Sequence, residues 1–424
     1  MTAAARPAGC RPAHLARRRP TCLPDRTMHR PGLDRYSDGL LAAAARIDPE
    51  GKALGPRILV VGGSIGGLFA AVLLHRAGFD VTVTERSRHG LEGRGAGLVA
   101  QEEVFAILRE VGFEHVARMG VVARERIYLD QAGGIIHRQQ MPQAQLSWDL
   151  LFRSFRELLP AERYQTGQQA VAVEREGDGA RVLYADGSAE QADIVIGADG
   201  IGSVVRTAVA GGSSRPAYVG YATWRGLVPE SAVPRSAAHQ LFDRFAFYEM
   251  PQSQILGYLV AGADGGIEKG RRRYNWVWYR HYSADALEAV LTDIDGERRP
   301  FSVAPGRVRP EMVAEMRGDA ERLLPPSFAA AVLAEQQPFL HAIFDYAPPR
   351  MVAGRIALMG DAAFVARPHT AMGVAKAAGD AFALRDALRG ASDLDAALEA
   401  YEAERAPVGR SIVAYGKRLG QSLD

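Results

Sequence analysis

Residues 57–86 read RILVVGGSIGGLFAAVLLHRAGFDVTVTER, and this stretch decides the fold of the chain. The apolar run 58–61 predicts a buried strand, and after a glycine-rich turn apolar residues recur at helical spacing until Gly78. Residues 81–84 predict a second strand with Glu85 at its carboxyl end. The stretch is therefore a βαβ unit, in which a helix N-terminus offers backbone N–H groups to a pyrophosphate and an acidic side chain can bind a ribose hydroxyl.

The glycine turn differs at one position from the G-x-G-x-x-G pattern of dinucleotide sites. Gly62 fits the tight turn and Gly67 fits the close contact of helix and strand, but Ser64 replaces the middle glycine. Serine is small, and its hydroxyl can bond a phosphate oxygen. A membrane-spanning helix is the alternative for the uncharged run 58–74, but this run is shorter than the roughly 20 residues of a span and is broken by glycines. We therefore expect no membrane segment here.

Composition and charge limit the class of protein. A chain of 424 residues has room for two domains, and 47% hydrophobic with 24% charged residues is typical of a soluble globular protein. The formal net charge of +2 argues against nucleic acid as the main partner. Cys10 and Cys22 both lie in the first 56 residues, so we expect no disulfide and no cysteine metal site in the folded part, and a cytoplasmic location.

The first 56 residues differ in kind from the rest. They are rich in Arg, Pro and Ala, which predicts a disordered tail, and they lack the apolar run of a secretory signal. A transit peptide is one alternative. A start site placed too far upstream, with Met28 as the true first residue, is another.

Residues 215–346 are predicted to form a second domain, built on a largely antiparallel sheet that covers a pocket above the nucleotide-binding domain. This region carries three of the four tryptophans. The strands that we expect here are 240–248, 255–261 and 274–282, and the helices are 284–293 and 310–317. The nucleotide-binding domain then comprises residues 57–214 and 347–424, and its C-terminal part is helical.

Two further segments repeat the pattern of a strand followed by a turn and a helix. Residues 197–206 read GADGIGSVVR, and residues 354–384 read GRIALMGDAAFVARPHTAMGVAKAAGDAFAL. Asp199 and Asp361 each follow a predicted strand, at the sheet edge where ligands of doubly wound folds bind. For Asp199, a local helix cap is an alternative that is compatible with ligand binding.

In this order the three segments resemble the single-component FAD-dependent aromatic hydroxylases of the para-hydroxybenzoate hydroxylase-like family, from about residue 57 to about residue 420. The resemblance implies an α/β fold with a Rossmann-type FAD-binding domain, an antiparallel substrate domain and a C-terminal helical segment. It also implies that NADH or NADPH reduces FAD. Dioxygen then forms a flavin hydroperoxide, which hydroxylates an electron-rich aromatic or N-heteroaromatic ring. The partners are thus a small aromatic substrate and dioxygen, and a homodimer is possible.

The resemblance also assigns roles to single residues. Ser64, Ile65 and Gly66 would contact the FAD pyrophosphate, Glu85 the adenosine ribose, and Asp361 the ribityl hydroxyls. Asp199 would serve both FAD and the visiting nicotinamide nucleotide, and residues 371–375 would present backbone N–H groups to the pyrimidine end of the flavin. The complete implied FAD set is Gly62, Ser64, Ile65, Gly66, Gly67, Glu85, Arg86, Gly97, Leu98, Asp199, Asp361, Ala371, Met372, Gly373, Val374 and Ala375. Met372 and Ala375 depart from the family pattern P-x-x-G-Q-G-x-N, which puts the strength of FAD binding in question.

Two residues just before the helix predicted at 373–388 are candidate catalytic groups. The resemblance places His369 beside the isoalloxazine, where an imidazole can accept a proton from a ring hydroxyl. Arg367 would stabilise the anion that results. A histidine that only packs, bonded to a backbone carbonyl, and a solvated loop arginine are the alternatives.

Two other functions compete with hydroxylation. Trp276 and Trp278 form a W-x-W that faintly resembles flavin-dependent halogenases, although Tyr279 and Arg280 follow where that group has Ile-Pro. The departures at Met372 and Ala375 allow a flavin-binding protein without turnover. No metal-ligand cluster and no Ser/His/Asp motif is recognised in the sequence, so we predict no metal site.

Overall fold

The computed structural model describes residues 55–88, 91, 97–421 and 423. The predicted tail lies outside the described residues up to residue 54, together with both cysteines and Met28. Within the described ranges, no helix is both long enough and apolar enough to cross a membrane.

The βαβ unit predicted from residues 57–86 is confirmed. β1 (Arg57–Val61) leads into α2 (Ile65–Arg76), and β2 (Asp80–Glu85) returns parallel to β1. The six-stranded sheet has the order β19-β20-β12-β1-β2-β8 and is parallel except at β19, which is antiparallel to β20. Its other strands are β8 (Tyr164–Thr166), β12 (Ile194–Gly197), β19 (Val352–Ala353) and β20 (Ile356–Leu358).

The parallel order brings the predicted nucleotide-binding residues together. Strands β1, β2, β12 and β20 run in one direction, so their carboxyl ends lie at one edge of the sheet. Gly62, Glu85, Asp199 and Asp361 are all at or just beyond these ends. The sheet thus assembles residues that are up to about 300 positions apart in the sequence.

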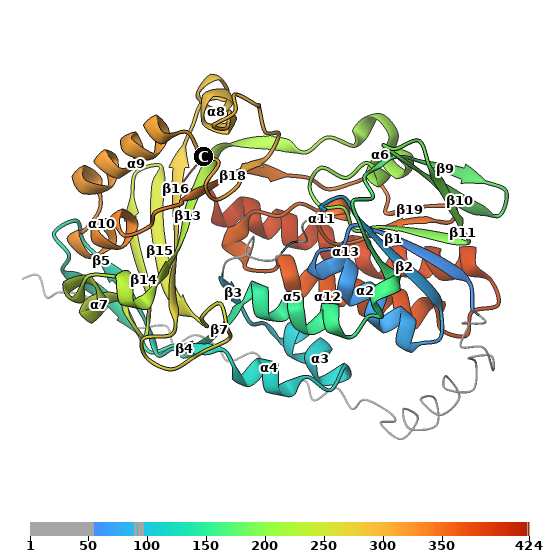
Figure 1. The fold of residues 1–424 in the computed structure, drawn as a ribbon, viewed down its shortest axis with the longest axis horizontal. Coiled ribbons are helices and arrows are strands. Elements are labelled where there is room, and N and C mark those ends of the chain that lie inside the picture. The colour runs from blue at the N-terminus through green and yellow to red at the C-terminus, as the bar shows by residue number, and fades with distance from the viewer. Residues whose placement is uncertain (1–54, 89–90, 92–96, 422, 424) are drawn as a thin grey trace, which may run out of the picture. The chain divides into compact units, whose positions relative to one another are not determined.

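The first hydrophobic core surrounds this sheet. It includes α2, α12 (Gly373–Leu388) and α13 (Leu394–Leu419), which lie close to the parallel strands in Figure 1. Helix α2 is buried along almost its whole length, from Ile65 to Leu74. This burial on all sides explains why residues 65–74 of the helix are uncharged without spanning a membrane.

The second core lies on one face of an eight-stranded sheet. The sheet order is β17-β18-β13-β16-β15-β14-β5-β6, antiparallel except between β14 and β5. Its strands are β5 (Glu125–Leu129), β6 (Ile135–Gln139), β13 (Ala217–Pro229), β14 (Arg244–Met250), β15 (Ser253–Val260), β16 (Arg273–His281), β17 (Ser302–Val303) and β18 (Phe339–Asp345). Helices α9 (Pro310–Leu323) and α10 (Pro326–Leu333) cover this face (Figure 1). Trp224, Trp276 and Trp278 are fully buried in the core between them and the sheet.

The remaining elements are short. Helices in this group are α3 (Glu102–Glu110), α4 (Glu114–Arg118), α5 (Trp148–Glu157), α6 (Val205–Ala210), α7 (Arg235–Leu241), α8 (Ala284–Leu291), α9 (Pro310–Leu323), α10 (Pro326–Leu333) and α11 (Gly360–Ala363). Two three-stranded sheets consist of β3 (Gly97–Val99), β7 (Gln143–Ser147) and β4 (Val121–Ala123), and of β9 (Ala170–Glu176), β10 (Gly179–Tyr184) and β11 (Ala189–Ala192).

The second sheet differs from the sequence prediction in two ways. The strand expected at 240–248 starts later, because α7 extends to Leu241. The sheet also contains β5 and β6, which precede residue 215 and were expected in the nucleotide-binding domain. A hairpin pattern identifies two paired strands but does not say which sheet they join, and here β5 pairs with β14 over 100 positions later.

We predict that Gly67→Val abolishes FAD binding. A Cβ at Gly67 would lie 1.9 Å from the carbonyl oxygen of Gly62, so a branched side chain must push α2 away from β1. Flavin content after purification and the thermal midpoint measure the effect.

Gly318→Ala in α9 is the matched control for this variant. A Cβ at Gly318 would meet nothing within 4 Å, so this variant keeps both flavin and stability. Full flavin occupancy in Gly67→Val would contradict the role of this turn.

Candidate functional site

The turn between β1 and α2 forms a cradle of backbone donors. Gly62 has a φ of +110°, a conformation that favours glycine, and its carbonyl closely approaches Gly67. Ser64 is the N-cap of α2, but its side chain makes no capping hydrogen bond. The amides of the first turn, which have no acceptor within their own helix, are therefore suited to an anion.

Glu85 is held in one orientation at the end of β2. It is buried, with Oε2 accepting from the Gly63 amide at 2.9 Å and Oε1 from the Ser87 amide at 2.8 Å. Each carboxylate oxygen can accept a second bond, so the group remains suited to a ribose hydroxyl. Arg86 beside it is exposed.

Three helices begin next to one another at this sheet edge. A Cβ on Gly66 would lie 3.4 Å from Cβ of Ala377, and a Cβ on Gly360 would lie 3.7 Å from the same atom. Gly66 is in the first turn of α2, Gly360 begins α11, and Ala377 is in the second turn of α12. Their N-termini therefore converge, and their dipoles make this region favourable for negative charge.

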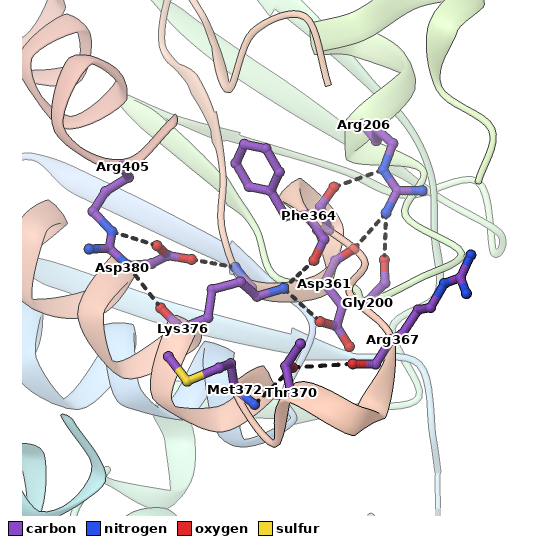
Figure 2. Close-up of polar contacts among 12 residues, drawn as sticks. Gly200, Arg206, Asp361, Phe364, Arg367, Thr370, Met372, Lys376, Asp380 and Arg405 are labelled. Atoms are coloured by element: carbon purple, nitrogen blue, oxygen red, sulfur yellow. Dashed lines mark hydrogen bonds and ion pairs between the residues drawn. The ribbon is translucent and has the colours of Figure 1, made fainter. Parts of the chain in front are cut away.

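A buried lysine connects two of these helices (Figure 2). Nζ of Lys376 donates to Oδ1 of Asp361 at 2.9 Å and also to the carbonyl of Phe364. The Lys376 side chain is 1% exposed, whereas that of Asp361 is 54% exposed. Lys376 thus holds the Asp361 carboxylate from the buried side, while the carboxylate remains accessible to solvent.

Asp380 anchors the same helix on its other side (Figure 2). Its Oδ2 accepts from the Gly360 amide at 2.9 Å, and its Oδ1 accepts from Nε of Arg405 in α13 at 2.8 Å. One carboxylate therefore ties together α11, α12 and α13.

Arg206 joins the two loops that carry Asp199 and Asp361. It is 1% exposed, and its guanidinium donates to the carbonyls of Asp361 at 2.6 Å, Ala362 at 2.7 Å and Ile201 at 2.7 Å. Figure 2 shows it reaching Gly200 as well. Arg206 thus connects the loops after β12 and β20 through hydrogen bonds to their backbone carbonyls.

Asp199 acts as a local cap, as the sequence allowed. Its carboxylate accepts from the Ser203 hydroxyl, from the Val204 amide at 2.7 Å and from the Val205 amide at 3.4 Å. Burial raises the pKa of Asp199, although these hydrogen bonds act in the opposite direction. The carboxylate stabilises the start of α6 and holds the adjacent Gly200 turn in place.

The segment before α12 is a short 3₁₀ turn, Pro368–Thr370, followed by Ala371 in the left-handed region at φ 53°. The Thr370 hydroxyl accepts from the Met372 amide at 3.1 Å, and Nε2 of Gln101 donates to the Ala371 carbonyl at 2.8 Å. Met372 makes no side-chain cap, and a Cβ at Gly373 would meet nothing within 4 Å. Gly373, the first residue of α12, is therefore exposed with open space beside it, whereas Ala375 and Lys376 in the same turn are buried.

His369 lies against the eight-stranded sheet. Its Nε2 is 3.0 Å from the Tyr221 hydroxyl, and its ring stacks on Tyr279 with the centroids 4.4 Å apart. The hydrogen bond with Tyr221 joins two side chains, a contact that the sequence did not predict.

Arg367 is part of a buried ion pair. It is 6% exposed, so the solvated loop arginine is wrong. Its Nε donates to Oδ2 of buried Asp345 at 3.1 Å, and its guanidinium lies 5.6 Å from the centre of the Tyr221 ring. This ion pair connects the His369 turn to β18, and the expected role of Arg367 in stabilising a substrate anion stays a prediction.

Gly97 connects the first core to the same sheet. The Tyr258 hydroxyl donates to the Gly97 carbonyl at 3.0 Å, and the Gly97 amide donates to Oδ1 of Asn275 at 3.5 Å. Leu98 follows in β3 and is half-buried. The face of the sheet that carries Tyr258 and Tyr279 therefore contacts both Gly97 and His369.

The W-x-W motif lies on the opposite face. Trp276 and Trp278 are buried in the second core, and Nε1 of Trp278 donates to the Ser253 hydroxyl at 2.9 Å. Their positions explain the motif as packing of the sheet against its helices.

Sequence reasoning missed three residues that organise the site: Gln101, Arg206 and Lys376. Arg206 ends the quoted GADGIGSVVR segment, but nothing in the sequence shows that its guanidinium reaches the loop after β20. A lysine within an otherwise apolar run, as Lys376 is, was the one available signal.

Family models match two parts of the chain. A model described as FAD binding domain-like matches residues 218–345, and one described as FAD binding domain matches residues 327–415. The first match covers most of the large sheet and the second covers α11, α12 and most of α13.

Similar proteins cover most of the chain. The 2,6-dihydroxypyridine 3-monooxygenase of Paenarthrobacter nicotinovorans is 33% identical over 372 residues, which are 87% of this chain and 91% of that protein. The 3-amino-4-hydroxybenzoate 2-monooxygenase PtmB3 of Streptomyces platensis is 31% identical over 87% of this chain and 88% of its own length. The solved structure of 2,6-dihydroxypyridine-3-hydroxylase from Arthrobacter nicotinovorans has a TM-score of 0.82 at 32% identity, covering 88% of this chain and 93% of that one. The nucleotide cradle, the α/β fold and this level of identity together show that the chain belongs to the family of FAD-dependent aromatic-ring monooxygenases.

Proposed function

We propose that this protein hydroxylates an electron-rich aromatic or N-heteroaromatic ring of the dihydroxypyridine or phenol type. NADH or NADPH serves as the reductant and dioxygen as the source of the oxygen atom. The observation that carries the proposal is the position of His369, between the start of the α12 helix and two tyrosines of the large sheet. Relatives named for hydroxylated pyridine and benzoate rings support the substrate class.

The residues present fit FAD. The first turn of α2, with Ser64, Ile65 and Gly66, supplies backbone donors for the pyrophosphate, and Glu85 supplies an acceptor for the adenosine ribose. Asp361 presents a half-exposed carboxylate to the ribityl hydroxyls.

The first turn of α12 suits the pyrimidine end of the flavin, because the amides of a first turn have no acceptor within their own helix and Gly373 is exposed. Met372 and Ala375 lack the side-chain amides of the family pattern, but backbone N–H groups do not depend on them. When bound, FAD supplies the redox and oxygen chemistry, and the protein orients the ring and excludes water.

In this proposal His369 handles the proton of the ring hydroxyl. Its imidazole accepts that proton, or donates to the ring oxygen, while the Tyr221 hydroxyl keeps the imidazole in one orientation. A ring with an ionised hydroxyl is a stronger carbon nucleophile, which is what transfer of an electrophilic oxygen requires.

The domain boundaries, the cytoplasmic location and the homodimer belong to the same proposal. We assign residues 57–214 and 347–424 to FAD and 215–346 to the substrate, with β5 and β6 added to the substrate side because they complete its sheet. Sedimentation of the purified protein measures the oligomeric state.

We expect incorporation of one oxygen atom from ¹⁸O₂ into a ring probe, with NADH oxidised in the same amount. 2,6-Dihydroxypyridine and 3-amino-4-hydroxybenzoate are the first probes, and mass spectrometry reads the product. NADH oxidation that yields only peroxide with every probe would favour a flavoprotein without productive turnover. A chloride-dependent product would favour a halogenase.

Asp361→Ala should weaken FAD binding by roughly 10- to 100-fold, since a hydrogen bond to a charged group contributes about 1.5–3 kcal/mol. The apoprotein should also lose stability, because the variant leaves the buried Lys376 without its carboxylate partner, so the affinity is measured under conditions in which the variant is folded. Equilibrium dialysis with FAD measures the affinity.

Asp386→Ala is the control for that variant. Asp386 is an exposed acid on the same helix α12, paired with Arg385, and its removal should leave FAD affinity unchanged. Equal FAD affinity in the two variants would remove Asp361 from the site.

His369→Ala is expected to bind FAD like the parent but to lose hydroxylation, or to uncouple it so that NADH oxidation yields peroxide. The reason is that the proton acceptor disappears while the α12 backbone is untouched. Tyr221→Phe, which removes only the hydroxyl at 3.0 Å from Nε2, should show a milder form of the same defect.

His281→Ala, an exposed histidine at the end of β16, serves as the control for His369→Ala. It should hydroxylate at the parental rate. Coupled product formation at that same rate in His369→Ala would dismiss His369 as a proton acceptor.

A further inference from the structure

Arg225 is a lone charge in an apolar row of side chains that crosses the large sheet. Directly paired positions on neighbouring strands place Phe339, Arg225, Val277, Leu256 and Phe247 side by side. Paired residues share a face, and faces alternate along a strand, so Arg225 is on the same face as Tyr221 and Thr223.

This face is the one that contacts the predicted flavin-binding segments. Tyr221 and Tyr279 contact His369, and Tyr258 donates to the carbonyl of Gly97. The pair of Thr223 with Tyr279 lies on one side of the Arg225 row, and the pair of Asn275 with Tyr258 lies on the other. Arg225 is therefore between the His369 contact and the Gly97 contact.

Arg225 is partly exposed, although two tyrosines on the same face of the sheet are buried. Tyr258 is 5% exposed and Tyr279 is 3% exposed, whereas Arg225, Leu227 and Leu256 keep intermediate exposure. Nε of Arg225 is itself buried and has no hydrogen-bond partner. A small molecule can thus reach a guanidinium that has unused donor capacity.

No acidic partner balances this charge among the residues that the structure describes. The arginines of the neighbouring strand are paired, Arg273 with Asp149 and Arg280 with Asp319, but no described carboxylate lies within 4 Å of Arg225. A partly buried cation without a counter-charge is costly, so the site favours an anion.

The titratable neighbours of Arg225 are neutral. Burial raises the pKa of Tyr258 to about 12 and raises that of Tyr279 as well. Burial, assisted by the charge of Arg225, lowers the pKa of His341 to about 3. None of these groups carries a negative charge at neutral pH, so the anion must come from a ligand.

We propose that Arg225 binds an anionic oxygen of the aromatic substrate, either a ring oxyanion or a ring carboxylate, and thereby orients the ring between the large sheet and His369. The inference rests on the proposed function. A planar guanidinium can donate two parallel hydrogen bonds to such an oxygen or carboxylate. The apolar neighbours Phe339, Val277 and Leu256 suit the faces of an aromatic ring.

The proposal is tested without turnover by measuring the Kd of ring compounds for the FAD-loaded enzyme. Binding is monitored through the change in flavin absorbance. The probes are 2,6-dihydroxypyridine, whose anion is a ring oxyanion, 3-amino-4-hydroxybenzoate, which adds a carboxylate, and uncharged 2,6-dimethoxypyridine. Arg225→Met should raise the Kd of one or both anionic probes by roughly 10- to 100-fold and leave the Kd of the uncharged probe unchanged. Arg225→Lys should recover part of the loss, because it keeps the charge without the planar fork.

Arg280→Met is the matched control, since Arg280 is on the opposite face of the same sheet and pairs with Asp319. It should bind all probes like the parent. A larger effect on 3-amino-4-hydroxybenzoate than on 2,6-dihydroxypyridine identifies the carboxylate as the bound group, and the reverse identifies the ring oxyanion.

Three results would overturn the inference: an anionic-probe Kd in Arg225→Met within twofold of the parent, loss of FAD from that variant, or a parent that binds neither anionic probe. A parent that binds the anionic probes through Arg225 but incorporates no oxygen would contradict the proposed function and leave the inference standing.

Discussion

The close contact between Gly67 and the carbonyl of Gly62 is the constraint on which the nucleotide site depends. It holds the start of α2 directly against the end of β1, at a distance that leaves no room for any Cβ. The next contacts follow from it, because Gly66 and Gly360 both approach Ala377. Small residues at these positions allow three helix N-termini to share one edge of the sheet, and that convergence makes the edge favourable for negative charge.

The charges beneath this surface nearly cancel one another. Lys376 is paired with Asp361, and Arg405 with Asp380, so two cations face two carboxylates. Burying Lys376 is offset by its bonds to Asp361 and to the Phe364 carbonyl. The preference for an anion at the start of α12 therefore comes from oriented backbone dipoles, which are fixed before a ligand arrives and need no reorganisation.

Local sequence patterns predicted those parts of the fold in which one short segment contains the whole signal. The βαβ unit and the acidic residues at the ends of β2, β12 and β20 are of this kind. The parts that were missed depend on contacts between distant segments. No periodic pattern in the sequence predicts that β5 pairs with β14. None predicts that Arg206 of α6 contacts the loop after β20.

The two arginines Arg367 and Arg225 show why the site needed the structure. The sequence offered Arg367 for an anionic ring because it adjoins His369, but the fold brings Asp345 of β18 to it, and the pair is buried. That pair has another consequence: it ties the turn carrying His369 to the same sheet that carries Tyr221 and Tyr279. A balanced ion pair thus helps to set the position of the imidazole relative to the sheet, whereas the charge that we propose for a ligand belongs to Arg225, on the adjacent strand β13. In the proposed function, ligand binding by Arg225 and proton transfer by His369 therefore depend on the same sheet, since Tyr221 and Arg225 both lie on β13.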